Sequence, residues 1–323
     1  MAGRILVTGG SGFIGTSLVE SLVRDGLTVL SLDRSQPLNR SHRSVWQSID
    51  LLDRDALIAV FREFGPEQVV HMAARTDLDS DTVLEDYAVN TRGTVNVLDA
   101  AEQAGTVSRM LITSSMLVCR LGYRPESDTD YAPDTMYGKS KVETERIARE
   151  RNPSFEWALI RPTTIWGPYH LRLRDEFFRM LRKGLYLHPA GKPCRRSYGY
   201  VGNAVHQVRR LLEAPRKDVH GRTFYIGDPP IELDDYIHGF SRRLTGRDAR
   251  TVPYFIMKSA ALCGDLLSAL GWKTVPLTSY RLGNMTRDNV LDMEPTLEVT
   301  GPNPFSLEQG IEETARWLDQ AAE

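Results

Sequence analysis

Cysteine is scarce in this chain of 323 residues, which contains three. Cys119, Cys194 and Cys263 lie far apart in the sequence, with neither the spacing of a zinc site nor that of a disulfide framework. We therefore expect no metal centre and no disulfide-stabilised secreted domain. Scattered, unpaired cysteines are typical of proteins in the reducing cytoplasm, and a cytoplasmic location is expected.

Long apolar runs are lacking too, since none reaches the roughly 18 residues of a membrane-spanning helix. The nearest, residues 252–270, is interrupted by Lys258, Gly264 and Asp265. The first residues do not show the basic and apolar regions of a signal peptide. We expect no integral membrane segment. The interrupted run has two interpretations, a core or lid helix and a contact surface for a lipid-like substrate.

An excess of charge of either sign is also absent. Lysine and arginine number 40 and the acidic residues 42, which gives a formal net charge of −2. Such a balance gives no attraction to nucleic acid or membranes through net charge, and we expect no nucleic-acid partner. The length allows one large domain or one and a half.

A glycine-rich turn near the start of the chain is its most informative feature. Residues 4–7 form an apolar run that predicts a strand, and Leu18 and Leu22 recur at helical spacing after it. Between them, glycines at 10, 12 and 15 fit the G-x-G-x-x-G fingerprint, and those at 9, 12 and 15 fit a related spacing. These glycines permit a tight turn and close approach of a pyrophosphate to the backbone. The helix N-terminus then favours phosphate, so the turn predicts a dinucleotide site.

Short apolar segments alternate with longer amphipathic ones through the first half, as in the βαβ units of a parallel sheet. We expect an α/β fold, a Rossmann-type doubly wound parallel sheet with a smaller, discontinuous C-terminal substrate lobe. The nucleotide-binding domain is expected at 1–165, with a returning segment near 196–228, and the lobe at 166–195 and 229–323. The expected strands are 4–7, 28–32, 69–71, 109–113, 157–161 and 223–226, and the expected helices include 55–64, 82–103 and 136–151.

The residues after the second expected strand bear on the choice of nucleotide. Asp33 stands about twenty residues past the glycines, where an acid accepts hydrogen bonds from the adenosine ribose and repels a 2′-phosphate. NAD is therefore expected, although Arg34 beside it is a residue that accepts the extra phosphate. Asp50 and Leu51 are candidates for an adenine contact, with a helix N-cap at Asp50 or Asp53 as the alternative.

A tyrosine and a lysine four residues apart, Tyr137 and Lys141, are expected on one face of a helix. Ser114 and Ser115 follow a predicted strand, at the sheet edge where ligands bind in such folds. An unperturbed tyrosine has a pKa near 10, and a neighbouring ammonium and a cationic nicotinamide are both expected to lower it toward that of a useful base. Ser115 is placed to orient a substrate hydroxyl or carbonyl. This pattern predicts hydride transfer coupled to proton transfer.

These residues together resemble the extended short-chain dehydrogenase/reductase family, and within it the nucleotide-sugar epimerase and dehydratase branch. The resemblance implies Ser115, Tyr137 and Lys141 as the catalytic triad, and a homodimer formed by the helices near 82–103 and 136–151. It is carried by residues 8–15, 33, 50–51, 71–74, 90–96, 113–115, 137–141 and 161–168.

The same resemblance assigns cofactor and substrate contacts. Arg196 and Arg281 fall where arginines bind the substrate diphosphate, and solvated surface arginines are the alternative; Thr164 replaces a usual asparagine. His170 and His188 are expected to be exposed rather than to contact a sugar. The expected cofactor contacts are Gly9, Gly12, Phe13, Ile14, Gly15, Asp33, Arg34, Asp50, Leu51, Ala73, Ala74, Asn90, Tyr137, Lys141 and Pro162, and the expected substrate contacts are Ser115, Thr164, Arg196 and Arg281.

The expected activity is NAD-dependent epimerisation of a nucleotide-diphosphate sugar, with C4 as the expected carbon. Dehydratase activity is discounted, because Met116 and Leu117 replace the Asp-Glu pair that follows the catalytic residue in dehydratases. The alternative is a reductase or hydroxyl dehydrogenase that acts on a sugar or a 3β-hydroxysteroid-like substrate. It would use the same residues for a single hydride transfer, without returning the hydride. A non-catalytic NAD-sensing or scaffold protein is the remaining alternative.

Overall fold

A parallel sheet of seven strands forms the centre of the structure, a computed structural model that describes residues 3–78, 81–272 and 275–321. Its strand order is β11-β6-β5-β4-β1-β2-β3, and every neighbouring pair runs parallel. Its strands are β1 (Arg4–Thr8), β2 (Thr28–Leu32), β3 (Trp46–Gln47), β4 (Gln68–His71), β5 (Arg109–Thr113), β6 (Glu156–Pro162) and β11 (Thr223–Ile226).

The side on which the chain adds successive strands to this parallel sheet changes at β1, between β2 and β4. From β1 the strands proceed to β2 and β3 on one side, and the chain then returns to place β4 on the other side of β1. In open parallel sheets, ligands bind outside the carboxyl ends of the strands at such a switch point. The expected doubly wound fold is confirmed, including the returning strand β11.

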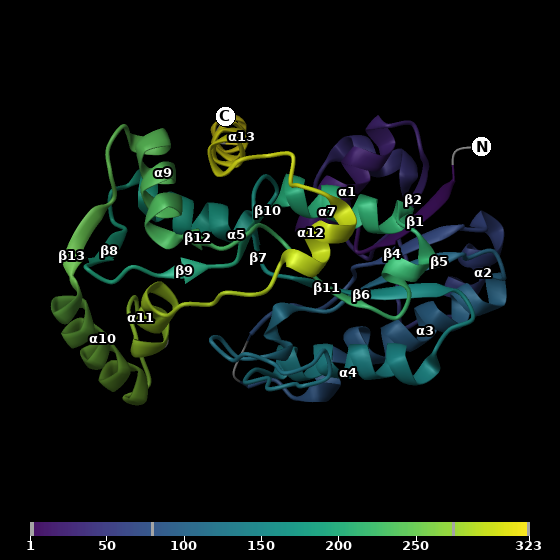
Figure 1. Cartoon of the computed structure of the whole chain (residues 1–323), viewed down its shortest axis with the longest axis horizontal. Coiled ribbons are helices and arrows are strands. Elements are labelled where there is room, and N and C mark those ends of the chain that lie inside the picture. Colours follow the sequence, from purple (N-terminus) through teal and green to yellow (C-terminus); the bar gives the residue numbers. More distant parts are fainter. Residues whose placement is uncertain (1–2, 79–80, 273–274, 322–323) are drawn as a thin grey trace.

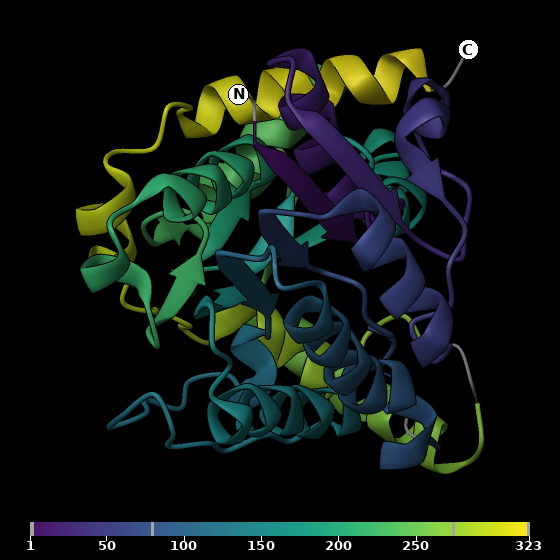
Figure 2. The ribbon, with the colours of Figure 1, turned by 90° about the vertical axis from the view of Figure 1, so that its right-hand side faces the viewer.

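Helices cover both faces of the sheet (Figures 1 and 2). One core joins alternate side chains of β1, such as Val7, to α1 and α7, and the other joins Leu6 to α2 and α3. Because neighbouring residues of a strand point to opposite faces, an almost continuous apolar strand such as β1 serves both cores. The helices are α1 (Phe13–Arg24), α2 (Arg54–Phe64), α3 (Ala88–Ala104), α4 (Met136–Arg151) and α7 (Val201–Glu213).

One expected helix boundary is wrong. The helix expected at 82–103 begins at Ala88, and Leu84–Tyr87 form a separate 3₁₀ turn. The Asp86 carboxylate accepts a hydrogen bond from the backbone of Val83 at 2.9 Å, and the Arg75 guanidinium donates to the Asp86 carbonyl at 3.1 Å. These contacts hold the turn apart from the α-helix that follows.

Several segments that follow β6 form a second lobe beside the sheet, seen on the left of Figure 1; they include β8, β9, β12, β13, α9, α10 and α11. The part after β11 does not all lie there, because Thr296 of α12 donates a hydrogen bond to the Tyr225 carbonyl of β11 at 2.6 Å. The division into two domains stays a prediction. These remaining elements are β7 (Thr164–Trp166), α5 (Leu171–Leu173), α6 (Arg179–Arg182), β8 (Leu187–Ala190), β9 (Arg195–Arg196), β10 (Tyr198–Tyr200), α8 (Arg216–Val219), β12 (Ile231–Glu232), α9 (Leu233–Thr245), β13 (Arg250–Pro253), α10 (Tyr254–Ala269), α11 (Ser279–Thr286), α12 (Glu294–Thr300) and α13 (Leu307–Gln320).

None of the helices in the described parts of the chain is both long and apolar enough to span a bilayer.

Candidate active site

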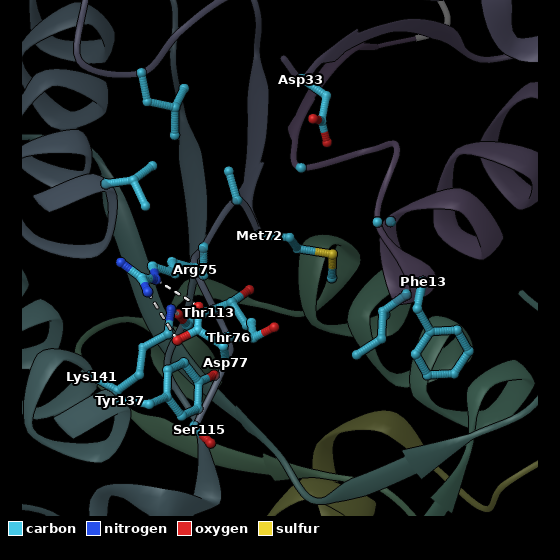
Figure 3. Close-up of a pocket in the computed structure, with 18 of the residues that line it drawn as sticks. Phe13, Asp33, Met72, Arg75, Thr76, Asp77, Thr113, Ser115, Tyr137 and Lys141 are labelled. Carbon is cyan, nitrogen blue, oxygen red and sulfur yellow. Dashed lines mark hydrogen bonds and ion pairs between the residues drawn. The ribbon is translucent and has the colours of Figure 1, made fainter. Parts of the chain in front are cut away.

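A cavity of about 1190 Å³ opens at the carboxyl edge of the sheet, next to the switch point between β1 and β4. Figure 3 shows Asp33 toward one end and Ser115, Tyr137 and Lys141 gathered at the other. The fold therefore brings the two groups of residues that the sequence singled out into one space. The predicted residues that line it are Gly9, Gly12, Phe13, Ile14, Gly15, Asp33, Arg34, Asp50, Leu51, Ala73, Ala74, Ser115, Tyr137, Lys141 and Pro162.

The glycine turn leaves no room for side chains. Gly9 has φ +75°, and a Cβ on it would lie 2.5 Å from the Ala73 nitrogen. A Cβ on Gly15 would lie 2.1 Å from the Gly9 carbonyl oxygen. The backbone at the start of α1 therefore forms a bare wall of the cavity, where the first amides of the helix have no partner within the helix. This wall fits the pyrophosphate of a dinucleotide.

The carboxylate of Asp33 is held by the backbone at the end of β2. It accepts hydrogen bonds from the amides of Ser11, at 3.2 Å, and Ser35, at 2.9 Å. Asp53 accepts a hydrogen bond from the Ala56 amide at 3.1 Å and is the N-cap of α2. Of the two residues considered for this N-cap, it is therefore Asp53 and not Asp50. Asp50 lines the cavity instead. This end therefore offers two carboxylates to a nucleoside.

At the other end, α4 positions Tyr137 and Lys141 one turn apart. The helix begins where the Thr135 side chain accepts a hydrogen bond from the Gly138 amide at 2.9 Å. The Lys141 ammonium donates to the Thr113 carbonyl of β5 at 2.8 Å. Ser115, just past β5, accepts a bond from the Leu117 amide at 3.1 Å, which fixes its hydroxyl. A strand end and a helix start thus share one corner of the cavity.

The pKa of Tyr137 differs from expectation. Burial raises it to about 12, because desolvation disfavours the phenolate; the hydrogen bond from Ser115 acts in the opposite direction, and the nearby Tyr87 side chain adds a smaller raising effect. In the protein without cofactor, the Lys141 ammonium is not among the groups that lower this pKa, so the lowering expected from the ammonium is not found there. Burial also lowers the pKa of Lys141 to about 8, against a raising effect of the Glu145 charge. The two groups are therefore buried to a degree that disfavours charge on either.

A buried ion pair under this corner was missed by the sequence reasoning. Glu145 is 0% exposed and Arg161 1%, and they form two hydrogen bonds of 2.8 Å. Glu145 also accepts bonds from Ser114 at 2.5 Å and from Tyr131 at 2.9 Å. The pair thus links α4, β5 and β6. The available signal was the position of Glu145, four residues after Lys141 on the same helix face.

The loop after β4 supplies cavity residues that were also missed. Arg75 pairs with Asp77 at 2.6 Å, and both line the cavity. Asn90, expected to touch the cofactor, lies outside the lining. Its side chain bonds instead to the amide of Arg75, at 2.8 Å, and to the carbonyl of Arg75, at 3.0 Å. Asn90 therefore holds the loop in place from behind.

The histidines are more buried than expected. His170 lines the cavity with its ring centroid 4.5 Å from that of Phe13, and burial lowers its pKa to about 4. His188 is 1% exposed and bonds to Asp234 at 2.8 Å. The expectation of exposure is wrong for His188, which is buried where β8 packs against α9, whereas His170 is half-buried against Phe13 of α1. His170 lines the cavity and His188 does not.

Of the four residues expected to contact the substrate, Ser115 lines the cavity, and Thr164, Arg196 and Arg281 lie outside its lining. Thr163 and Ile165 line it, so Thr164, between them on an extended segment, points away. Arg196 is 4% exposed and donates to the Arg287 carbonyl at 3.2 Å, while its Nε has no hydrogen-bond partner among the described residues. Arg281 is exposed on α11 and donates to the carbonyls of Val275 and Pro276. The cavity as it stands is therefore mainly a cofactor site.

Comparison with known proteins gives consistent similarities. An N-acetyl-alpha-D-glucosaminyl-diphospho-ditrans,octacis-undecaprenol 4-epimerase of Escherichia coli O157:H7 is 27% identical over 328 residues, which cover 98% of this chain and 96% of the relative. A 3 beta-hydroxysteroid dehydrogenase/Delta 5→4-isomerase of Mycobacterium tuberculosis is 32% identical over 255 residues, covering 72% of this chain and 67% of the relative.

Among solved structures, a UDP-glucose 4-epimerase with UDP-glucose from Thermotoga maritima superposes with a TM-score of 0.75 at 20% identity, covering 99% of this chain and all of that one. The model of the NAD dependent epimerase/dehydratase family matches residues 5–227, well over half of the chain. The glycine wall, Asp33 and the corner that holds Ser115, Tyr137 and Lys141 all lie within that match. The protein thus belongs to the NAD dependent epimerase/dehydratase family and is an enzyme that uses NAD.

Proposed function

We propose that the protein is a 4-epimerase of a diphosphate-linked sugar, with a nucleotide as the carrier. The main observation in support of this proposal is that Ser115, Tyr137 and Lys141 line the same cavity as the glycine wall and Asp33. The full-length similarity to a 4-epimerase supports the choice of reaction. We assign the cofactor contacts to the lining residues named above, with Asn90 supporting the loop that carries Arg75.

The chemistry that bound NAD supplies is reversible acceptance of a hydride. In our proposal Tyr137 removes the proton from the sugar hydroxyl and returns it after the keto sugar has turned over. Ser115 holds that hydroxyl. Lys141, which does not lower the pKa of Tyr137 in the protein alone, is proposed to favour the phenolate once the cofactor is bound. Because the pKa of Tyr137 is raised to about 12 in the protein, chiefly by burial, the proposed base would need the positive charge of an oxidised nicotinamide nearby before it loses its proton at neutral pH.

The substrate diphosphate is proposed to bind Arg196. Its unpaired Nε is a buried donor of the kind that leaves a free-energy penalty until an acceptor arrives. The guanidinium fork is suited to bidentate phosphate contacts. Since Arg196 is 4% exposed, this role requires the strands around it to open toward the cavity. For Arg281 we propose a structural role, because its guanidinium already bonds two carbonyls.

A hydroxyl dehydrogenase acting on a steroid-like alcohol is the second candidate. The 32% identity to a 3 beta-hydroxysteroid dehydrogenase favours it. In such an enzyme Tyr137 and Lys141 would serve a single hydride transfer in each turnover, and NADH would be released. An epimerase instead retains the reduced cofactor and returns the hydride to the substrate.

We further propose a cytoplasmic homodimer formed through α3 and α4. Cys119, Cys194 and Cys263 are all free thiols, which is compatible with a reducing compartment. Light scattering of the purified protein tests the dimer, and a monomer at micromolar concentration would reject it.

The proposed reaction is tested by incubating the enzyme and NAD with UDP-, GDP-, CDP- and dTDP-hexoses and with 3β-hydroxysteroids, followed by NMR. We expect a C4 epimer from at least one sugar nucleotide and no net NADH. Steroid oxidation with stoichiometric NADH would instead select the dehydrogenase.

A further inference from the structure

Helix α10 presents an apolar surface to solvent. Its outward side carries Phe255, Leu262, Leu266 and Leu270, which are 70%, 57%, 63% and 69% exposed and recur at helical spacing. Trp272, just beyond the helix, is 64% exposed. No other stretch of similar length among the described residues exposes as many large hydrophobic side chains. We call these five residues the α10 face. Exposed apolar patches on this scale mark interaction sites.

The orientation of α10 is fixed by the residues on its inward side. Met257 and Ala261 pack with Leu282 of α11 in a small core. A Cβ on Gly264 would lie 1.9 Å from the Leu277 carbonyl oxygen, so that the following segment presses directly on the helix. Rotating the helix to bury the leucines would remove these contacts. The outward position of the α10 face is therefore a built feature of the lobe.

Cationic side chains border this face. Lys258 is exposed on α10 itself, one turn from both Phe255 and Leu262. The Lys192 ammonium lies 5.0 Å from the ring centroid of Tyr254, the first residue of the helix. Further basic residues on the adjoining segments are Arg250, four residues before the helix, and Arg281, bonded to the carbonyls of Val275 and Pro276.

The nearby carboxylates are already engaged. Asp265 of α10 accepts a hydrogen bond from the Ser279 amide at 3.0 Å. Asp248, just before β13, pairs with Arg242 at 3.0 Å. Asp234 bonds to His188 of β8 at 2.8 Å. Asp265 keeps its negative charge, because a backbone amide does not neutralise it, but the four basic residues named above outnumber it. The surroundings of the α10 face thus carry an excess of positive charge although the chain as a whole is slightly acidic.

We propose that the α10 face binds the surface of an anionic phospholipid bilayer. Leucine and phenylalanine side chains would enter the acyl boundary, an indole would sit at the headgroup level, and the long side chain of Lys258 would reach the phosphates. Figure 1 places α10 at the outer end of the second lobe, away from the sheet, so the cavity stays accessible while the helix lies on a membrane.

A second copy of the chain fits this face less well. A helix of 16 residues is about 24 Å long and about 10 Å wide, so one side of it covers a few hundred Å² at most. Stable interfaces bury about 800 Å² on each partner. The face is large enough for shallow membrane contact, which gains from added electrostatic attraction to anionic lipids.

Cys263 offers a direct probe, because it is the exposed cysteine beside the α10 face whereas Cys119 and Cys194 are buried. The protein labelled there with an environment-sensitive fluorophore is mixed with vesicles of phosphatidylcholine containing about one third phosphatidylglycerol. We expect a blue shift with these vesicles, a smaller one with pure phosphatidylcholine, and weakening at high salt. The control label, at Glu63→Cys on α2 in a Cys263→Ser background, should not shift.

Vesicle flotation of the unlabelled protein completes the test. Phe255→Ser with Leu266→Ser should lower the bound fraction at least tenfold, whereas the control Leu38→Ser with Val83→Ser, exposed apolar residues elsewhere, should not change it. Light scattering of the wild type and both double variants measures their oligomeric state in parallel. Absence of wild-type binding, equal binding of both double variants, or a dimer that only the α10 variant abolishes would overturn the proposal.

Discussion

The sheet and the outer end of the second lobe differ in how they use apolar residues. Around the sheet, leucines such as Leu6 and Leu57 are completely buried, and helices pack on both faces. At the outer end, α10 and α11 share a small core while Leu266 is 63% exposed. The first region holds the proposed catalytic residues at fixed positions in a buried corner of the cavity. The second keeps apolar surface available for contact with something outside the chain.

The sharpest way to test the first region is to remove its base. Tyr137→Phe should lower kcat by about three orders of magnitude, within the usual contribution of a general acid–base, while NAD still binds. Stopped assays and NAD titration measure both quantities. Tyr123→Phe, which removes a hydroxyl bonded to Asp130 outside the cavity, is the control and should retain activity. Full activity of the Tyr137 variant would refute the assignment.

The buried pair beneath the base should matter for both stability and pH dependence. Glu145→Gln leaves Arg161 buried without a counter-charge, which should lower the free energy of unfolding by about 3–5 kcal/mol. It also removes the charge that raises the pKa of Lys141, so that pKa should fall below about 8.

Activity that needs the Lys141 ammonium should then be lost at lower pH than in the wild type. Urea unfolding and a pH profile of kcat measure the two effects. Glu143→Gln is the control, because Glu143 is an exposed partner of Arg146 on the same helix. An unshifted alkaline limb would show that Glu145 acts on packing alone.

A matched pair of leucines compares the two regions directly. Leu57→Ala, at a completely buried site in α2, should lower the free energy of unfolding by about 2–5 kcal/mol. Leu266→Ala, on the exposed side of α10, should change it by less than about 0.5 kcal/mol. Urea denaturation measures both. A large loss at Leu266 would mean that α10 is covered in solution.

Two glycines extend the comparison to cofactor binding. Gly15→Ala places a methyl 2.1 Å from a backbone oxygen of the glycine turn, and should weaken NAD about tenfold or more. Gly283→Ala in α11 meets its nearest atom at 3.6 Å, and should leave NAD affinity unchanged. Isothermal titration calorimetry with NAD measures the affinity of each variant. Equal affinities would contradict the close approach of the cofactor to the turn.

Much of the sheet and the catalytic corner follows from local pattern. The strands are short apolar runs, and α4 has the predicted bounds, so that Tyr137 and Lys141 fall on one side of it. The switch point then brings the glycine turn and the corner together.

The substrate side depends on contacts between distant parts of the chain. Arg196 is placed by pairing with Ile231 of β12 and by a bridge to Asn289, neither of which leaves a local signal. The 3₁₀ turn before α3 likewise depends on Arg75, eleven residues earlier. Sequence patterns thus brought the proposed catalytic residues to the cavity, whereas Thr164, Arg196 and Arg281, expected to contact the substrate, lie outside its lining.

The central claim is that one hydride leaves and returns at the same sugar carbon. The direct measurement uses sugar nucleotides deuterated at C4, incubated with the enzyme and NAD in ordinary water and analysed by NMR and mass spectrometry. We predict a C4 epimer that keeps its deuterium, with no net NADH. Loss of deuterium to solvent, or a keto product formed with stoichiometric NADH, would contradict it.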